Sequence, residues 1–211
     1  MITLNNSFYR KEVQKMLKKL SFALFSALLL VFVSTGIKAA GNPGDQVQDF
    51  TLQNYDGTSY TLSSQKDVKA TVIMFWSAEC PFVQGYNDRI NDFVSEYTAK
   101  GINFWAINAN STESMKDVES HAKEHNYPFP VLKDVNNIVA DNIGATRTPE
   151  VFVIDQNRTI LYHGRISDNR DKSKETSFDL KNALDEILAG KEVTVKETKS
   201  FGCGIKKSQG N

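Results

Sequence analysis

Continuous apolar runs alternate with helical periodicities along most of the chain, and this alternation predicts a sheet covered by helices. Ala70–Trp76 is a run of apolar, β-branched and aromatic residues, which is typical of a strand buried on both faces of a sheet. Over Val83–Tyr97 apolar residues recur every three or four positions, and Gly101 can close the pattern, which predicts one amphipathic helix of about five turns. Phe104–Ala109 repeats the strand pattern. The order strand, helix, strand predicts parallel pairing through a right-handed crossover.

Two antiparallel hairpins are predicted around this unit. Phe50–Leu52 and Ser59–Leu62 flank Asp56-Gly57, whose tolerance of positive φ favours a tight reversal. Val151–Ile154 and Thr159–Tyr162 flank four polar residues in the same way. The other predicted elements are a short strand, Phe129–Leu132, and three helices: one that starts at Ser114 with Asp117 in capping-box spacing, Asn137–Ile143 closed by Gly144, and Leu180–Leu188 ended by Gly190. Together they indicate an α/β fold with a mixed central sheet and helices on both faces.

The first 40 residues have the layout of a secretory signal peptide. Lysines precede an apolar run, Leu20–Val33, that ends in small and polar residues. Met16 is an alternative start, and small residues place the cleavage site near residues 39–41. An uncleaved membrane anchor is the other interpretation, although the run is shorter than the roughly 20 residues of a spanning helix. We therefore expect an exported protein, periplasmic or secreted, that contacts a membrane only if the leader is retained.

The remainder of the chain is mildly acidic. The first 40 residues hold six of the 25 basic and one of the 25 acidic side chains, which leaves 19 against 24 and a formal charge of −5. No basic face stands out to neutralise phosphates, so nucleic-acid binding is disfavoured. We expect one domain over residues 41–190, with a polar surface loop at 165–176, followed by a lysine- and glycine-containing, solvated tail at 191–211 that carries Cys203.

Cys80 is the most informative residue of the chain. It lies between a predicted buried strand and a predicted helix, which would expose its thiol at a helix N-terminus and lower the thiol pKa. The neighbouring Glu79 would oppose that shift, because a like charge disfavours the thiolate. The alternative is that Cys80 is a small apolar residue at a helix start. Cys80 and Cys203 are the two cysteines of the chain, so one bridge is possible if their Cα atoms come within about 7 Å.

Several separated motifs resemble the thioredoxin superfamily. Phe75–Cys80 resembles the Phe-Trp-Ala-x-x-Cys run before the thioredoxin active site, and Thr148-Pro149 stands at the place of the superfamily's cis-proline. Asp49–Leu52 with its Asp-Gly turn is similar to the start of redoxins and peroxiredoxins. A narrower resemblance, to the peroxiredoxin-like redoxin group (alkyl hydroperoxide reductase and thiol-specific antioxidant type), covers about residues 46–207 and rests on Cys80–Val83, Ile107–Asn110, Phe129–Asp134, Tyr162–Ile166 and Gly202–Lys206.

The resemblance implies a thioredoxin-like fold with an N-terminal β-hairpin. It further implies that Cys80 is the nucleophile, and that Thr148 and Pro149 shape a groove where an extended substrate segment pairs beside the sulfur. Two departures limit what carries over. Val83 stands where thioredoxins have their second cysteine. Ile73 and Ser77 stand where the peroxidatic pattern Pro-x-x-x-Thr-x-x-Cys has its proline and threonine.

Three functions remain open. The first is an exported thiol–disulfide oxidoreductase in which Cys80 attacks and Cys203 resolves, acting on protein or small-molecule thiols and disulfides, with an unidentified electron donor. The second is an antioxidant thiol peroxidase that uses Cys80 on hydroperoxides. The third is a non-catalytic binding module in which both cysteines form a structural disulfide, worth roughly 4–5 kcal/mol for so long a loop. Cys203 could also stay unpaired.

We expect neither a cofactor nor a metal. His121, Glu124 and His125 match the His-x-x-Glu-His spacing of an inverted zinc-protease motif. A zinc site needs a third protein ligand, and the predicted fold offers none nearby.

Overall fold

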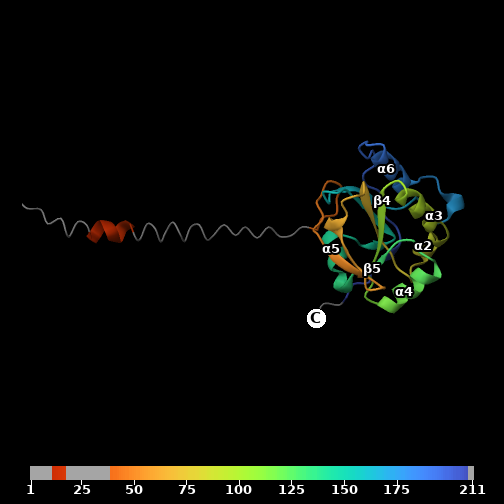
Figure 1. The fold of residues 1–211 in the computed structure, drawn as a ribbon, viewed down its shortest axis with the longest axis horizontal. Coiled ribbons are helices and arrows are strands. Elements are labelled where there is room, and N and C mark those ends of the chain that lie inside the picture. The colour runs from red at the N-terminus through yellow and green to blue at the C-terminus, as the bar shows by residue number, and fades with distance from the viewer. Residues whose placement is uncertain (1–10, 18–38, 209–211) are drawn as a thin grey trace, which may run out of the picture. The chain divides into compact units, whose positions relative to one another are not determined.

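The computed structural model describes residues 11–17 and 39–208 (Figure 1). Residues 11–17 are helical, and residues 39–208 form one compact unit. The apolar run Leu20–Val33 lies outside the described residues, so the leader stays a prediction from sequence. Within the described ranges, no helix combines the length and the apolarity needed to cross a membrane.

A seven-stranded mixed sheet forms the centre of the domain (Figure 1). Its strand order is β2-β1-β5-β4-β3-β7-β8. The central strands β3, β4 and β5 are parallel, and the pairs on either side of them are antiparallel. The bounds are β1 Thr51–Asn54, β2 Ser59–Thr61, β3 Ala70–Phe75, β4 Ile102–Asn108, β5 Val131–Lys133, β7 Glu150–Ile154 and β8 Ile160–Gly164. This confirms the predicted fold class, including the N-terminal hairpin.

Helices cover both faces of this sheet and explain why β3 is apolar throughout. Val72 and Met74 of β3 belong to a core shared with α3, α4 and α6, whereas Ile73 and Phe75 belong to a second core shared with α5. Both faces of the strand are therefore buried, as the sequence pattern predicted. The helices are α2 Pro81–Gln84, α3 Asn87–Thr98, α4 Met115–Glu124, α5 Ile138–Ile143 and α6 Asp179–Leu188, and short 3₁₀ turns cover Leu62–Ser64, Val135–Asn137 and Lys172–Lys174.

The helix predicted from Val83 onward is interrupted. Helix α2 ends at Gln84 and α3 begins at Asn87. A Cβ on Gly85 would lie 3.0 Å from the Arg170 side chain and 3.1 Å from its carbonyl oxygen, so the backbone passes close to another loop there. Tyr86 turns into the core at the break, and its hydroxyl lies 3.0 Å from Ser167 Oγ. The apolar residues of both helices still face the same core, which is why the periodicity conceals the break.

The segment after α6 packs on the domain through its backbone, while its lysine side chains stay exposed. The backbone of His163 in β8 donates to Lys196 O and accepts from Thr198 N, at 2.9 and 3.0 Å. Farther on, β9 (Cys203–Gly204) pairs with β6 (Arg147–Thr148) in a separate two-stranded sheet. Backbone groups make these contacts, and the polar composition of the segment gives no sign of them.

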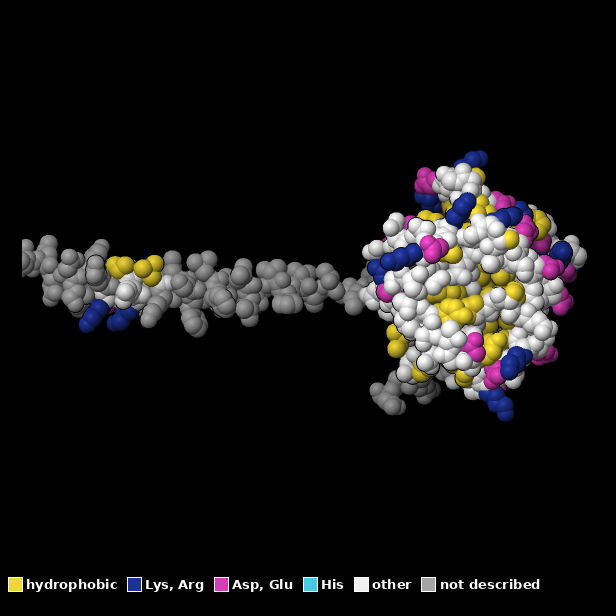
Figure 2. All heavy atoms as spheres, viewed as in Figure 1, with side chains coloured by type: hydrophobic (Ala, Val, Ile, Leu, Met, Phe, Trp, Pro, Cys, Tyr) yellow, Lys and Arg dark blue, Asp and Glu magenta, His cyan; other side chains and the backbone are white. Residues whose placement is uncertain are grey.

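Charges of both signs are interspersed over the face of the domain shown in Figure 2, and apolar side chains lie between them. That face presents no large basic patch, in keeping with the mildly acidic composition.

Candidate active site

Cys80 caps the short helix α2 at the carboxyl end of β3, where the sequence places it, but its thiol is not exposed. The residue is 2% exposed, and its Sγ donates to the carbonyl oxygen of Thr148 at 3.0 Å. The expectation of an exposed thiol is therefore wrong for this conformation. The reason is a neighbour distant in sequence: the C-terminal segment lies over the thiol.

Strand β9 brings Cys203 to Cys80. Thr148 pairs with Cys203 and Arg147 with Gly204 in an antiparallel register. Both cysteines therefore lie against Thr148: Cys80 Sγ donates to its carbonyl oxygen at 3.0 Å, and Cys203 is its partner in the strand pair. Cys203 is half-buried, and in the described part of the chain both cysteines are free thiols. The structure thus brings together the two sulfurs that the sequence could only count.

The two thiols have opposite pKa shifts. Burial opposes ionisation of Cys80, but hydrogen bonds from the Cys203 thiol and from backbone N–H groups, including that of Val83, outweigh it and lower the pKa of Cys80. Burial, followed by the hydrogen bond and charge of Cys80, raises the pKa of Cys203 to about 11. Cys80 is therefore the thiol of the pair that ionises first. Glu79, expected to oppose this, forms an ion pair with Lys206 at 3.0 Å.

The loop before β7 supplies the other two predicted site residues. The Thr148-Pro149 peptide bond is cis, as the resemblance implied. The carbonyl of Thr148 accepts the hydrogen bond from Cys80, and its buried Oγ1 has no hydrogen-bond partner. Thr148 and Pro149 therefore lie beside Cys80 and the tail.

Glu150 holds this loop in place. Its Oε2 accepts from the backbone N–H groups of Thr146 and Arg147 at 2.7 and 2.9 Å, and its Oε1 lies 2.8 Å from His163 Nε2. Burial raises the pKa of Glu150, but the hydrogen bonds from His163 and the two backbone groups outweigh it, so the net shift is downward. An ionised carboxylate therefore orients the backbone with which the tail pairs.

Glu113 is a site residue that the sequence analysis missed. It is 2% exposed, and its carboxylate accepts from Ser77 Oγ at 2.5 Å and from the backbone N–H of Ala78 at 2.8 Å. Asn108 and Asn110 each donate a side-chain amide to it at 2.6 Å. Burial raises the pKa of Glu113, but these four hydrogen bonds together lower it below the ordinary value. Glu113 thus fixes the turn that leads into Cys80.

The same network also holds the tail. Asn110 Oδ1 accepts from the backbone N–H of Lys206 at 2.8 Å, and the backbone N–H of Ser111 donates to Lys206 O at 2.8 Å. Lys133 Nζ, half-buried, donates to Asn108 Oδ1 and to Asn110 O. A single buried network therefore positions the segments on both sides of the sulfur pair. The sequence did contain a sign of this network: two asparagines stand at the carboxyl end of the strand predicted to run parallel to β3. The carboxyl ends of parallel strands lie at the same edge of a sheet, so these asparagines would be close to Cys80.

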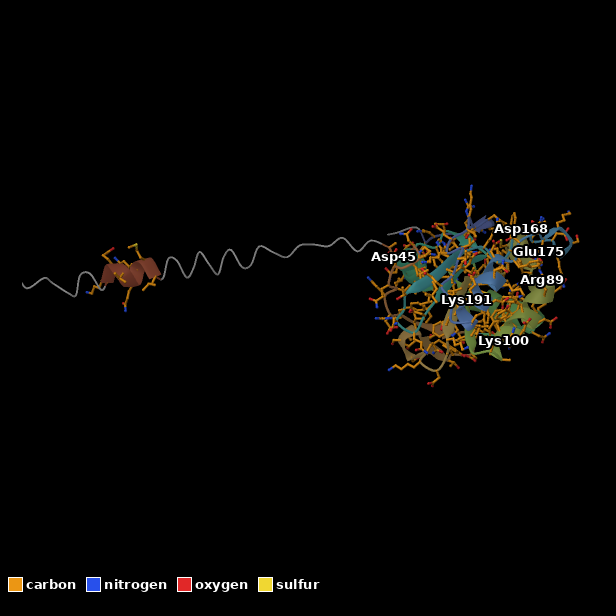
Figure 3. The ribbon with its side chains drawn as sticks, turned by 90° about the horizontal axis from the view of Figure 1, so that it is seen from above. Asp45, Arg89, Lys100, Asp168, Glu175 and Lys191 are labelled. Carbon is orange, nitrogen blue, oxygen red and sulfur yellow. The ribbon has the colours of Figure 1, made fainter. Side chains whose placement is uncertain are left out.

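The loop predicted at residues 165–176 supports the site from the other side. Arg89 and Glu175, labelled in Figure 3, form an ion pair, and Arg89 also donates to Arg170 O at 3.0 Å. Arg170 in turn lies over the ring of Phe82, 4.9 Å from its centroid, and donates to Pro81 O at 3.2 Å. The loop is therefore tied to the helix that follows Cys80.

His121 and His125 belong to an aromatic cluster. Their ring centroids are 4.6 Å apart, both rings pack on Tyr127, and His125 Nε2 lies 3.0 Å from Asn87 Nδ2. Across residues 11–17 and 39–208 there is no group of three or more His, Cys, Asp or Glu side chains arranged to hold a metal ion.

We expect the reduced protein to ionise in two steps, followed by the ultraviolet absorbance of the thiolate. The first step, from Cys80, lies below the ordinary pKa of 9, and the second, from Cys203, lies near 11. Cys203→Ala removes the thiol donor and should move the Cys80 step upward. Cys203→Ser keeps an O–H donor and should leave that step below 9. An unchanged Cys80 step in Cys203→Ala would contradict the assigned cause.

Glu113→Gln should lower the free energy of unfolding by about 1–3 kcal/mol, because its amide group faces buried donors. Urea unfolding measures this. The native pKa of Glu113 is lowered, so its stabilisation is present above the ordinary pKa of 4.5 and is lost as pH falls through the lowered value. The difference between the two proteins should therefore shrink in acid. Glu119→Gln, at an exposed ion pair, is the control and should change stability by less than about 0.5 kcal/mol.

Comparisons with known proteins place the chain in a family. A model of the AhpC/TSA family matches residues 43–163. The thiol-disulfide oxidoreductase ResA of Halalkalibacterium halodurans is 24% identical over 124 residues, which are 59% of this chain and 69% of ResA.

Two solved structures are similar over most of the domain. A hypothetical protein from Sinorhizobium meliloti is 34% identical with a TM-score of 0.75, covering 80% of this chain and 96% of that one. An uncharacterised conserved protein from Geobacillus kaustophilus is 33% identical with the same TM-score, covering 80% and 94%. The chain therefore belongs to the AhpC/TSA family of redoxins, within the thioredoxin superfamily.

Proposed function

We propose that the protein is an exported thiol–disulfide oxidoreductase whose redox pair is Cys80 and Cys203. The observation that carries the proposal is that strand β9 pairs Cys203 with Thr148, the residue whose carbonyl oxygen accepts the hydrogen bond from Cys80 Sγ at 3.0 Å. The pKa of Cys80 is lowered and that of Cys203 is raised, in keeping with this placement. This arrangement supplies the second sulfur that Val83 does not provide.

The reaction proceeds by two thiol–disulfide exchanges. The Cys80 thiolate attacks one sulfur of a substrate disulfide, which forms a mixed disulfide and releases the other substrate sulfur as a thiolate. Cys203 then loses its proton to the released thiolate and attacks the Cys80 sulfur. The second substrate sulfur leaves Cys80 as a thiolate, which takes a proton from water. The products are a Cys80–Cys203 disulfide and a substrate with both sulfurs reduced, so two electrons pass to the substrate. An external dithiol reverses the exchange and restores the protein.

The pKa values fit this order of events. The charge of Cys80 and the hydrogen bond to it help to raise the pKa of Cys203. Both effects end when Cys80 becomes part of a mixed disulfide, so Cys203 becomes easier to deprotonate at the moment when it must attack.

Peroxidase chemistry has less support. Ser77, which stands where the peroxidatic pattern has a threonine, donates its hydroxyl to Glu113. The hydroxyl proton of Ser77 is therefore used in the hydrogen bond to Glu113 and cannot also bind a peroxide at Cys80. A structural disulfide is the remaining alternative, and the reduction potential distinguishes it.

The proposal includes export, which rests on the lysines and the apolar run of residues 1–40. N-terminal sequencing of the mature protein should give a start near residues 39–41. A mature protein that still began at residue 1 or 16 would remove the support for a cleaved leader.

Exchange with a substrate disulfide tests the redox proposal directly. Cys80→Ser should abolish reduction of a protein disulfide, because the attacking sulfur is gone. Cys203→Ser should accumulate the mixed disulfide on Cys80, which mass spectrometry detects. Wild-type activity in Cys80→Ser would eliminate the proposal.

Two further measurements separate the alternatives. A reduction potential above about −300 mV indicates an exchangeable pair, and a lower value indicates a structural disulfide. Stopped-flow mixing with hydrogen peroxide should show no rapid sulfenic acid formation at Cys80, whereas rapid formation would favour the peroxidase.

A further inference from the structure

The edge of β6 is occupied by the chain's own C-terminal segment. Arg147 and Thr148 pair with Gly204 and Cys203, and the backbone N–H of Ile205 donates to Thr146 O at 2.9 Å. Among the described strands, β6 pairs with β9 alone. A two-residue strand beside the nucleophile therefore has its backbone groups satisfied by the tail.

The backbone of the tail passes closer to this edge than a residue with a side chain would allow. Gly202 has φ +149°, and a Cβ there would lie 2.1 Å from the carbonyl oxygen of Thr148. A side chain cannot fit so close to a backbone oxygen, so this path needs glycine directly before the cysteine. One residue after the cysteine there is no such restriction, because a Cβ on Gly204 would meet nothing within 4 Å.

Side-chain contacts extend the fit in both directions along the tail. The ring of Phe201 packs edge-to-face on Phe82, with centroids 5.9 Å apart. Three residues after the cysteine, Lys206 pairs with Glu79. The tail therefore presents an aromatic residue, a glycine, a cysteine and then a lysine to complementary groups around Cys80.

In this position the tail covers the thiol of Cys80. Cys80 is 2% exposed and touches Thr148 and Cys203. Its thiolate cannot reach a substrate disulfide while β9 is in place, so the tail must leave β6 before any exchange with a partner. The ion pair that helps to hold it is exposed at both side chains, and such pairs contribute little to stability.

We propose that residues 200–206 are an intramolecular occupant of the partner-binding edge. The partner is an extended protein segment with a cysteine preceded by glycine, and it pairs with Arg147–Thr148 in the place of Cys203–Gly204. This inference rests on the proposed function and adds the class of partner and the way in which it gains access. β-Strand addition of this kind takes its affinity from the backbone and its specificity from alternate side chains.

The shared edge couples resolution to product release. When Cys203 attacks the mixed disulfide, the bond between Cys80 and the partner sulfur breaks as the Cys80–Cys203 bond forms. The returning tail then needs the same backbone groups of β6 that held the partner segment. The reduced partner therefore loses its covalent bond and its strand pairing in one event.

Alkylation of Cys80 in the reduced full-length protein tests whether the tail covers its thiol. Gly202→Ala places a Cβ against Thr148, so the tail should leave β6 more often and Cys80 should react with iodoacetamide at least about tenfold faster. Gly204→Ala is the matched control and should react at the wild-type rate. Peptide mass mapping assigns the label to Cys80, and circular dichroism checks that both variants are folded.

A synthetic peptide tests the partner class. The probe is Ser-Phe-Gly-Cys-Gly-Ile-Lys, the sequence of residues 200–206, activated as a mixed disulfide. Its exchange with Cys80 in the Cys203→Ser protein should be at least about tenfold faster than that of the same peptide with alanine before the cysteine. Equal rates for the two peptides would overturn the proposed partner class.

These outcomes are distinct from failure of the proposed function. Equal alkylation of Cys80 in the Gly202→Ala and Gly204→Ala proteins would overturn the cover, while exchange with substrate disulfides could still proceed through Cys80. Wild-type substrate exchange in Cys80→Ser would overturn the function, while the alkylation difference between the glycine variants would still stand.

Discussion

The pairing of Arg147–Thr148 with Cys203–Gly204 is the interaction on which the site depends. It joins two segments far apart in the sequence and places a second sulfur beside Cys80. Without it, Cys80 would be a lone thiol at the end of a buried strand, because Val83 supplies no second cysteine. The carboxylates of Glu150 and Glu113 support the pairing, the first by fixing the loop of β6 and the second through the network that binds Lys206.

The buried carboxylate of Glu113 shows how a charge is accommodated beside the turn that leads into Cys80. Glu113 receives four hydrogen bonds, and Lys133 lies in the same network. A buried ion is tolerable only when its hydrogen-bonding capacity is met, and that requirement also makes the network rigid. The turn from Ser77 to Cys80 thereby takes its shape from polar groups, whereas the sheet beneath it takes its shape from apolar packing.

Most of the fold could be predicted from the sequence, and much of the site could not. Alternation and periodicity identified the strands and helices because burial on one or both faces leaves a repeating pattern, as in β3. The break at Gly85 leaves no such trace, since both helices face one core. The path of the tail could not be predicted because much of its attachment uses backbone groups, whose partners are independent of side-chain type. Glu113 was missed because a buried carboxylate in a loop has the same appearance in sequence as an exposed one.

The distance along the chain between the two sulfurs has a consequence for biosynthesis. Cys80 and Cys203 are separated by on the order of a hundred residues, and the sheet lies between them in sequence. A local dithiol motif can close as soon as one short stretch has been made. Here, pairing of the two sulfurs needs β9, the last strand that the structure describes, so Cys80 has no partner cysteine until Cys203 has been made and has reached β6. A chain that stops before Cys203 would carry Cys80 as its single cysteine, however well the central sheet had formed.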